Sequence, residues 1–119
     1  MNFEEKLAAY GVDVAVTMER LGNSEDLYLR CLDLFLNDGN MEELGKALEQ
    51  GDLKKGFEAA HALKGVSANL GLQPFYEKIC KIVEPLRAAD EQADYKTLYE
   101  EIALEEEKVK VLRAELGEK

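Results

Sequence analysis

Residues that start and stop helices recur along the whole chain, and their spacing constrains the fold more than any other feature. Asn2, Asp13, Ser24 and Asp52 can each cap a helix, because their side chains accept hydrogen bonds from the free N–H groups of the first turn. Pro74 suits the first turn of another helix, where its missing N–H costs nothing. The alternation typical of strands is nearly absent. We therefore predict helices over about 2–10, 14–21, 24–37, 41–49, 53–70, 73–89 and 94–116.

The longer predicted helices carry apolar side chains at helical spacing, so each has one face to bury. Short connections between them favour antiparallel neighbours. The length of 119 residues suits one domain. The predicted fold class is therefore all-α: an antiparallel (up-down) four-helix bundle with short N-terminal capping helices. We expect a single domain over 1–119, with its core bundle over about 24–116 and the capping helices over about 2–21.

Composition and charge exclude several classes of partner. The chain is 46% hydrophobic, enough for a core, yet no apolar run approaches the roughly 18 residues of a membrane span. The N-terminus lacks the basic and then apolar order of a signal peptide. A net charge of −10 repels nucleic acids and anionic membranes. We expect a cytoplasmic protein that binds neither nucleic acid nor membrane.

The acidic charge is unevenly distributed. Residues 51–85 hold five basic and four acidic side chains, so this window is close to neutral while the rest of the chain is strongly acidic. The two cysteines, Cys31 and Cys80, lie among apolar residues and have no Cys or His neighbour at metal-ligand spacing. We predict that both are buried free thiols rather than metal ligands.

The single histidine, His61, lies in the middle of the predicted 53–70 helix. At about 100° per residue, the helix places His61 away from the side expected to face the core. The core side is predicted to hold Leu53, Ala60, Leu63, Val66, Ser67 and Leu70. The flank around His61 is predicted to hold Lys54, Phe57, Glu58, Lys64, Gly65 and Ala68. The imidazole is therefore expected to face solvent.

Small residues on that flank leave the surface beside His61 bare. Gly65 follows one turn later, in a helix interior where glycine costs about 1 kcal/mol relative to alanine, and Ala68 follows Gly65. Lys64 lies on the same face and can reach an anion held by His61. Neutral imidazole is nucleophilic near pH 7. The arrangement indicates a histidine that holds a phosphoryl group, without the second histidine or paired carboxylates needed to make or hydrolyse one.

The run from His61 to Gly71, HALKGVSANLG, resembles the signature of histidine-containing phosphotransfer (HPt) domains. The flanking pattern agrees: Gly11-Val12-Asp13, Leu27-Tyr28-Leu29, Leu34-Phe35 and Gly51-Asp52. This resemblance covers essentially the whole chain. It implies a four-helix bundle whose surface histidine takes a phosphoryl group from a receiver-domain aspartate and passes it to another receiver, without kinase activity of its own.

The resemblance also implies roles for individual residues. His61 is the expected phosphoacceptor through Nε2, Lys64 stabilises the phosphoryl oxygens, and Gly65 permits close approach. Lys54, Phe57, Glu58 and Ala68 are the expected docking residues, although Phe57 could instead be a boundary core residue. The expected partners are response-regulator receiver domains, a hybrid sensor histidine kinase, or both. Mg²⁺ belongs to the receiver's acidic pocket, so no metal or cofactor is expected here.

One position departs from the family pattern. Many members place Gln or Glu on the following helix to hydrogen-bond the other imidazole nitrogen, whereas here Val83 occupies that position, with Glu84 next to it. Either Glu84 turns in to orient the imidazole, or His61 is oriented less tightly.

Two other functions stay open. The chain could be the phosphoacceptor domain of a larger sensor or chemotaxis kinase, or an adaptor bundle that no longer transfers phosphate. The start at Met1 and the lack of kinase or receiver sequence favour a free-standing protein. We expect a monomer, although Leu104 and Val111 could form a weak dimer seam, and we expect the run Glu105-Glu106-Glu107 to be a solvated helix face.

Overall fold

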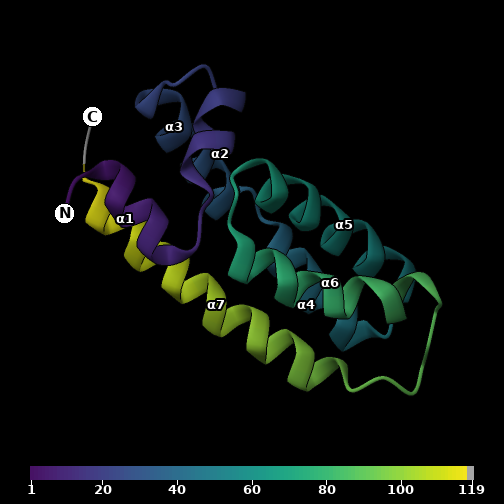
Figure 1. The fold of residues 1–119 in the computed structure, drawn as a ribbon. Helices are drawn as coiled ribbons and strands as arrows, with labels where there is room; N and C mark the ends of the chain where they lie inside the picture. Colours follow the sequence, from purple (N-terminus) through teal and green to yellow (C-terminus); the bar gives the residue numbers. More distant parts are fainter. Residues whose placement is uncertain (118–119) are drawn as a thin grey trace.

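The computed structural model describes residues 1–117, and this part of the chain is helical, with no strand (Figure 1). The helices are α1 (Phe3–Tyr10), α2 (Val14–Arg20), α3 (Glu25–Asn37), α4 (Asn40–Gln50), α5 (Leu53–Asn69), α6 (Gln73–Arg87) and α7 (Tyr95–Leu116). Their bounds differ from the predicted ones by at most two residues. The predicted single domain ends at residue 119, and its last two residues lie outside the described part.

The predicted caps explain why the helices start where they do. Asn2 forms a reciprocal capping box with Glu5, in which each side chain accepts a hydrogen bond from the other residue's backbone N–H. The side chains of Ser24 and Asp52 accept from backbone N–H groups in the first turns of α3 and α5, at 3.0 and 3.1 Å. Each cap satisfies a donor that has no partner within its own helix.

Helices α5, α6 and α7 lie side by side along the long axis of the molecule, and the chain reverses between them (Figure 1). Helix α4 contacts both α5 and α7, so four helices surround a common interior. The molecule measures 44 by 22 by 21 Å. One cluster of buried side chains extends from Leu7 in α1 to Leu116 in α7. The prediction of an all-α bundle is confirmed.

The N-terminal helices pack at the end of the bundle where α7 finishes (Figure 1). Lys6 Nζ in α1 donates to the Glu115 carbonyl in α7 at 2.6 Å. The Tyr10 hydroxyl, also in α1, donates to Glu105 Oε2 at 3.0 Å. Burial and the nearby Glu105 carboxylate raise the pKa of Tyr10, so the hydroxyl keeps the proton that it donates.

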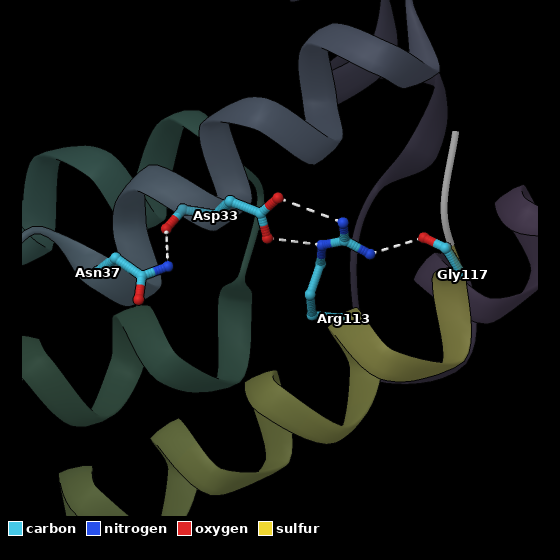
Figure 2. A network of polar contacts seen from close by, with 4 residues as sticks. All are labelled: Asp33, Asn37, Arg113 and Gly117. Atoms are coloured by element: carbon cyan, nitrogen blue, oxygen red, sulfur yellow. Dashed lines mark hydrogen bonds and ion pairs between the residues drawn. The ribbon is translucent and has the colours of Figure 1, made fainter.

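Helices α3 and α7 are joined by a bidentate ion pair (Figure 2). Arg113 donates from Nε and Nη2 to the two carboxylate oxygens of Asp33, at 2.7 and 3.2 Å. The same guanidinium donates from Nη1 to the Gly117 carbonyl at 2.6 Å, and the Asn37 amide donates to the Asp33 carbonyl at 2.7 Å. The forked geometry fixes the angle between the two helix ends.

Two predictions about exposure are wrong. The run Glu105-Glu106-Glu107 is not a uniformly solvated face: Glu105 is buried, Glu106 is half-buried and only Glu107 is exposed. The Tyr10 hydroxyl makes burial of Glu105 tolerable by satisfying one of its oxygens. Cys31 and Cys80 are free thiols as predicted, but both are half-buried rather than buried.

In the part of the chain that the structure describes, no helix is long and apolar enough to cross a membrane.

Candidate functional site

His61 lies in the middle of α5 with its side chain exposed, as the helical layout predicted. Its imidazole ring stacks on the ring of Phe57, one turn earlier in the same helix. The two ring centroids are 5.5 Å apart and the ring planes are inclined by 14°. Within residues 1–117, no side chain or backbone group forms a hydrogen bond with the imidazole, so both ring nitrogens are available.

The surface beyond His61 is open. Gly65 is exposed, and a Cβ atom added there would meet no heavy atom within 4 Å apart from its chain neighbours and the backbone of its own helix. Ala68 is also exposed, one turn further along α5. Lys64 is half-buried on the same flank, and its ammonium forms no ion pair within the described residues. The structure therefore brings together an exposed imidazole, an unneutralised cation and bare helix surface.

Of the residues predicted to dock a partner, Lys54, Glu58 and Ala68 are exposed on α5, and Phe57 is half-buried. Phe57 packs against the hydrophobic core with part of its side chain still accessible, so it lies at the boundary of the core and its docking role stays a prediction. Its ring also contacts Arg87 from α6, whose guanidinium carbon lies 5.6 Å from the ring centroid. Arg87 could not be identified from the sequence, because this contact depends on how α6 packs against α5.

Glu84, the predicted orienting residue, is engaged elsewhere. Its Oε1 atom accepts a hydrogen bond from Arg87 Nη1 at 2.7 Å, in an exposed ion pair within α6. Val83 beside it is fully buried. Of the two alternatives for the departure from the family pattern, the structure therefore contains the one in which neither Val83 nor Glu84 hydrogen-bonds the imidazole.

The buried side of α5 differs slightly from the predicted one. Ala60, Leu63, Ser67 and Leu70 are buried as expected, whereas Leu53 and Val66 are only half-buried. Gly56 and Ala59 are buried in addition. A Cβ atom at Gly56 would lie 3.3 Å from Leu86 Cδ2, so its missing side chain lets α6 approach closely. This packing holds the helix that presents His61 firmly on the bundle.

Three residues from earlier helices hold the C-terminal end of α5. The Tyr28 hydroxyl donates to the Leu70 carbonyl at 2.8 Å in a buried hydrogen bond. Arg20 Nη1 donates to the carbonyls of Ala68 and Asn69, at 3.2 and 2.7 Å. Thr17 packs against Gly71, which ends the helix in the left-handed conformation at φ +67°. The bonds from Tyr28 and Arg20 satisfy the Leu70 and Asn69 carbonyls, which have no partner within the helix.

The described residues contain no group of three or more His, Cys, Asp or Glu side chains placed to hold a metal ion.

Comparison with known proteins identifies the family. A family model described as "Hpt domain" matches residues 30–117, which is most of the chain. The chain belongs to the Hpt domain family. The match includes α4 to α7 and thus the whole of the helix that carries His61, the one histidine available to this Hpt domain.

A solved structure agrees with this assignment. The Hpt domain is similar to the crystal structure of histidine-containing phosphotransfer protein B (HptB) from Pseudomonas aeruginosa PAO1, with a TM-score of 0.76 and 27% sequence identity. The similarity covers 87% of this chain and 91% of that one, so it includes nearly the whole fold. A search of curated proteins found no match.

Proposed function

We propose that this Hpt domain is a phosphocarrier of a multistep phosphorelay, in which His61 receives a phosphoryl group from a receiver-domain aspartate and passes it to another receiver. The observation that supports this proposal most directly is the exposed imidazole of His61, beside the open surface at Gly65 and the unneutralised ammonium of Lys64. Membership of the Hpt family supports the same function.

The proposed transfer requires only groups that this site and a receiver possess. The lone pair of His61 Nε2 attacks the phosphorus of the aspartyl phosphate, the Nε2–P bond forms and the P–O bond to the aspartate breaks. The aspartate leaves as a carboxylate, and the imidazole retains its Nδ1 proton. In the second transfer a carboxylate of another receiver attacks the phosphorus, the P–Nε2 bond breaks and neutral imidazole leaves.

Lys64 is proposed to stabilise the phosphoryl oxygens. It follows His61 by three residues, a separation that places both side chains on one face of α5. Because no carboxylate among the described residues neutralises it, its charge is free to interact with a phosphoryl group carrying negative oxygens. Transfer of this kind depends mainly on positioning and electrostatic stabilisation, which a lysine beside the acceptor supplies.

The proposed partners are response-regulator receiver domains, a hybrid sensor histidine kinase, or both. Lys54, Glu58 and Ala68 are exposed around His61 and are proposed to contact them. We propose that Mg²⁺ is bound by the receiver, that this protein has no cofactor or kinase activity of its own, and that it acts as a monomer. A cytoplasmic location accords with free thiols at Cys31 and Cys80.

The test is transfer from a receiver charged with a small phosphodonor, followed by intact mass. The expected result is one acid-labile, base-stable phosphoryl adduct that His61→Gln lacks. Lys64→Gln should slow the transfer about threefold to tenfold, whereas Lys96→Gln, an exposed lysine on α7, should not.

Failure of every receiver from the source organism to phosphorylate the folded protein would contradict the proposal. Phosphorylation by an isolated kinase ATP-binding domain would then indicate a kinase-fed acceptor domain, and no phosphorylation by either donor would indicate an adaptor.

A further inference from the structure

The contact between Phe57 and His61 suggests how the imidazole is held in the absence of a hydrogen bond. Ring stacking at 5.5 Å and 14° is the one interaction recorded for the imidazole within residues 1–117. Offset stacked rings attract each other through their complementary charge distributions. An exposed histidine side chain would otherwise rotate freely between its rotamers.

Phe57 is itself fixed, so it can hold a neighbour in place. Its ring is half-buried and packs against the hydrophobic core. The Arg87 guanidinium lies 5.6 Å from the ring centroid, within the range of a cation–π contact, and the Glu84 carboxylate holds Arg87 at 2.7 Å. The contacts therefore connect α6 to the Phe57 ring, and the Phe57 ring to the imidazole.

We propose that Phe57 is a positioning residue for the phosphoacceptor: its ring fixes the plane of the His61 imidazole and so aims Nε2 into the open space beside Gly65. This inference rests on the proposed function and deepens it. Stacking restricts the ring plane but leaves both nitrogens, which lie on the ring edge, free of hydrogen bonds. Phe57 thus orients the imidazole by stacking. No side chain on α6 orients it by a hydrogen bond, since Glu84 is paired with Arg87.

Phe57 could affect transfer in a second way, by contacting the partner directly. The two roles separate when the donor is small, because a small donor makes no contact with a docking surface. Phosphoramidate is such a donor: Nε2 attacks its phosphorus, the P–N bond breaks and ammonia leaves. A positioning residue affects transfer from phosphoramidate and from a receiver alike, whereas a docking residue affects only transfer from the receiver.

The experiment compares Phe57→Leu, which keeps an apolar side chain against the core, with Phe57→Tyr, which keeps the ring. Because the chain has one histidine, its imidazole protons can be followed by NMR without ambiguity. In the parent protein these protons should be shifted upfield by the Phe57 ring, and the couplings to the His61 Cβ protons should indicate one dominant rotamer. Phe57→Leu should abolish the upfield shift and average the couplings, while Phe57→Tyr should preserve both.

The kinetic expectation follows from the strength of a stacked pair. Phe57→Leu should slow phosphorylation of His61 about twofold to tenfold with both donors, and Phe57→Tyr should restore the parent rate. Circular dichroism confirms that each variant is folded.

Three results would overturn the inference. The first is that the imidazole protons of His61 show no upfield shift in the parent protein. The second is a shift that Phe57→Leu abolishes without a change in either rate. The third is a loss of rate confined to the receiver, which would make Phe57 a docking residue. Failure of the relay itself is seen separately, because the parent protein would then accept phosphate from phosphoramidate but from no receiver.

Discussion

Tyr28 and Leu70 are separated by 42 residues in the sequence and joined by one buried hydrogen bond, from the tyrosine hydroxyl to the leucine carbonyl at 2.8 Å. Both residues are almost completely buried. The bond connects α3 to the last turn of the helix that carries His61. It is one of the contacts that determine where that helix ends.

Tyr28→Phe removes the hydroxyl that donates to the Leu70 carbonyl, so that this buried carbonyl loses its hydrogen bond. We expect the free energy of unfolding to fall by about 1–3 kcal/mol, the cost of an unsatisfied buried polar group. Urea denaturation measures the change. Tyr95→Phe is the matched control, because the Tyr95 hydroxyl also donates to a backbone carbonyl, that of Asp90, but in an exposed bond. Equal losses in the two variants would show that burial of the Tyr28 bond is unimportant.

Gly71→Ala should destabilise the fold for two separate reasons. The backbone at Gly71 has φ +67°, which costs a residue with a side chain about 1–2 kcal/mol. The added Cβ would also lie 2.4 Å from Thr17 Oγ1, so Thr17 or the helix end must move. Gly51→Ala isolates the first reason, because Gly51 has φ +70° and open space around it. Chemical denaturation should show the larger loss for Gly71→Ala; similar losses would mean that the Thr17 contact relaxes without cost.

Gly65→Ala should make the protein more stable and a poorer carrier. The added methyl group meets nothing within 4 Å beyond its chain neighbours and the backbone of its own helix, and alanine is favoured over glycine inside a helix by about 1 kcal/mol. The methyl group nevertheless occupies the surface that a receiver is proposed to approach. Transfer from a receiver should slow while phosphorylation by phosphoramidate stays unchanged. If the variant is more stable but accepts phosphate from receivers at the parent rate, the proposed role of Gly65 in close approach is contradicted.

The stability of the fold should depend on pH through Glu106. Burial raises the pKa of this half-buried carboxyl, with neighbouring Glu107 and Asp38 adding to the effect and Lys110 opposing it. A folded-state pKa above the unfolded one means that stability is fully present below the unfolded pKa, about 4.3, and is lost as pH rises through the folded pKa. At pH 7 the ionised carboxylate therefore destabilises the fold.

Glu106→Gln should accordingly raise the free energy of unfolding at pH 7 and have little effect below about pH 4, where the parent carboxyl is protonated. Urea denaturation at the two pH values tests the sign. Glu107→Gln is the control, since Glu107 is exposed and its replacement should change stability by less than about 0.5 kcal/mol at either pH. A Glu106→Gln variant that is less stable at pH 7 would show that the Lys110 contact outweighs burial.

The local features of this fold could be predicted from the sequence, because their causes are local. Asn2, Ser24 and Asp52 cap the helices that they were expected to cap, since a cap needs only its own first turn. The exposure of His61 followed from its position on one helix. The proximity of Phe57 to His61 could be predicted in the same way, because residues four apart on a helix are neighbours.

Features that depend on packing between distant segments could not be predicted. Glu105 is buried where α1 packs against α7, and Tyr10 of α1, 95 residues away in sequence, donates to it. Its acidic neighbours alone had indicated exposure. Glu84 bonds to Arg87 rather than to the imidazole, a choice that the sequence left open. The approach of Arg20 to the end of α5 likewise depends on where α2 packs.

The acceptor histidine stands in the middle of an unbroken helix of 17 residues, anchored at its far end by Arg20 and Tyr28. A side chain mounted on such a helix cannot be carried by a swinging loop, so it changes place only when the whole molecule does. For the proposed relay, the rate then depends on encounter with a receiver in the right orientation and on phosphoryl transfer at His61, with no loop closure of the carrier in between. The receiver must therefore come to the histidine, because the carrier has no moving segment within residues 1–117 that could bring the histidine to the receiver.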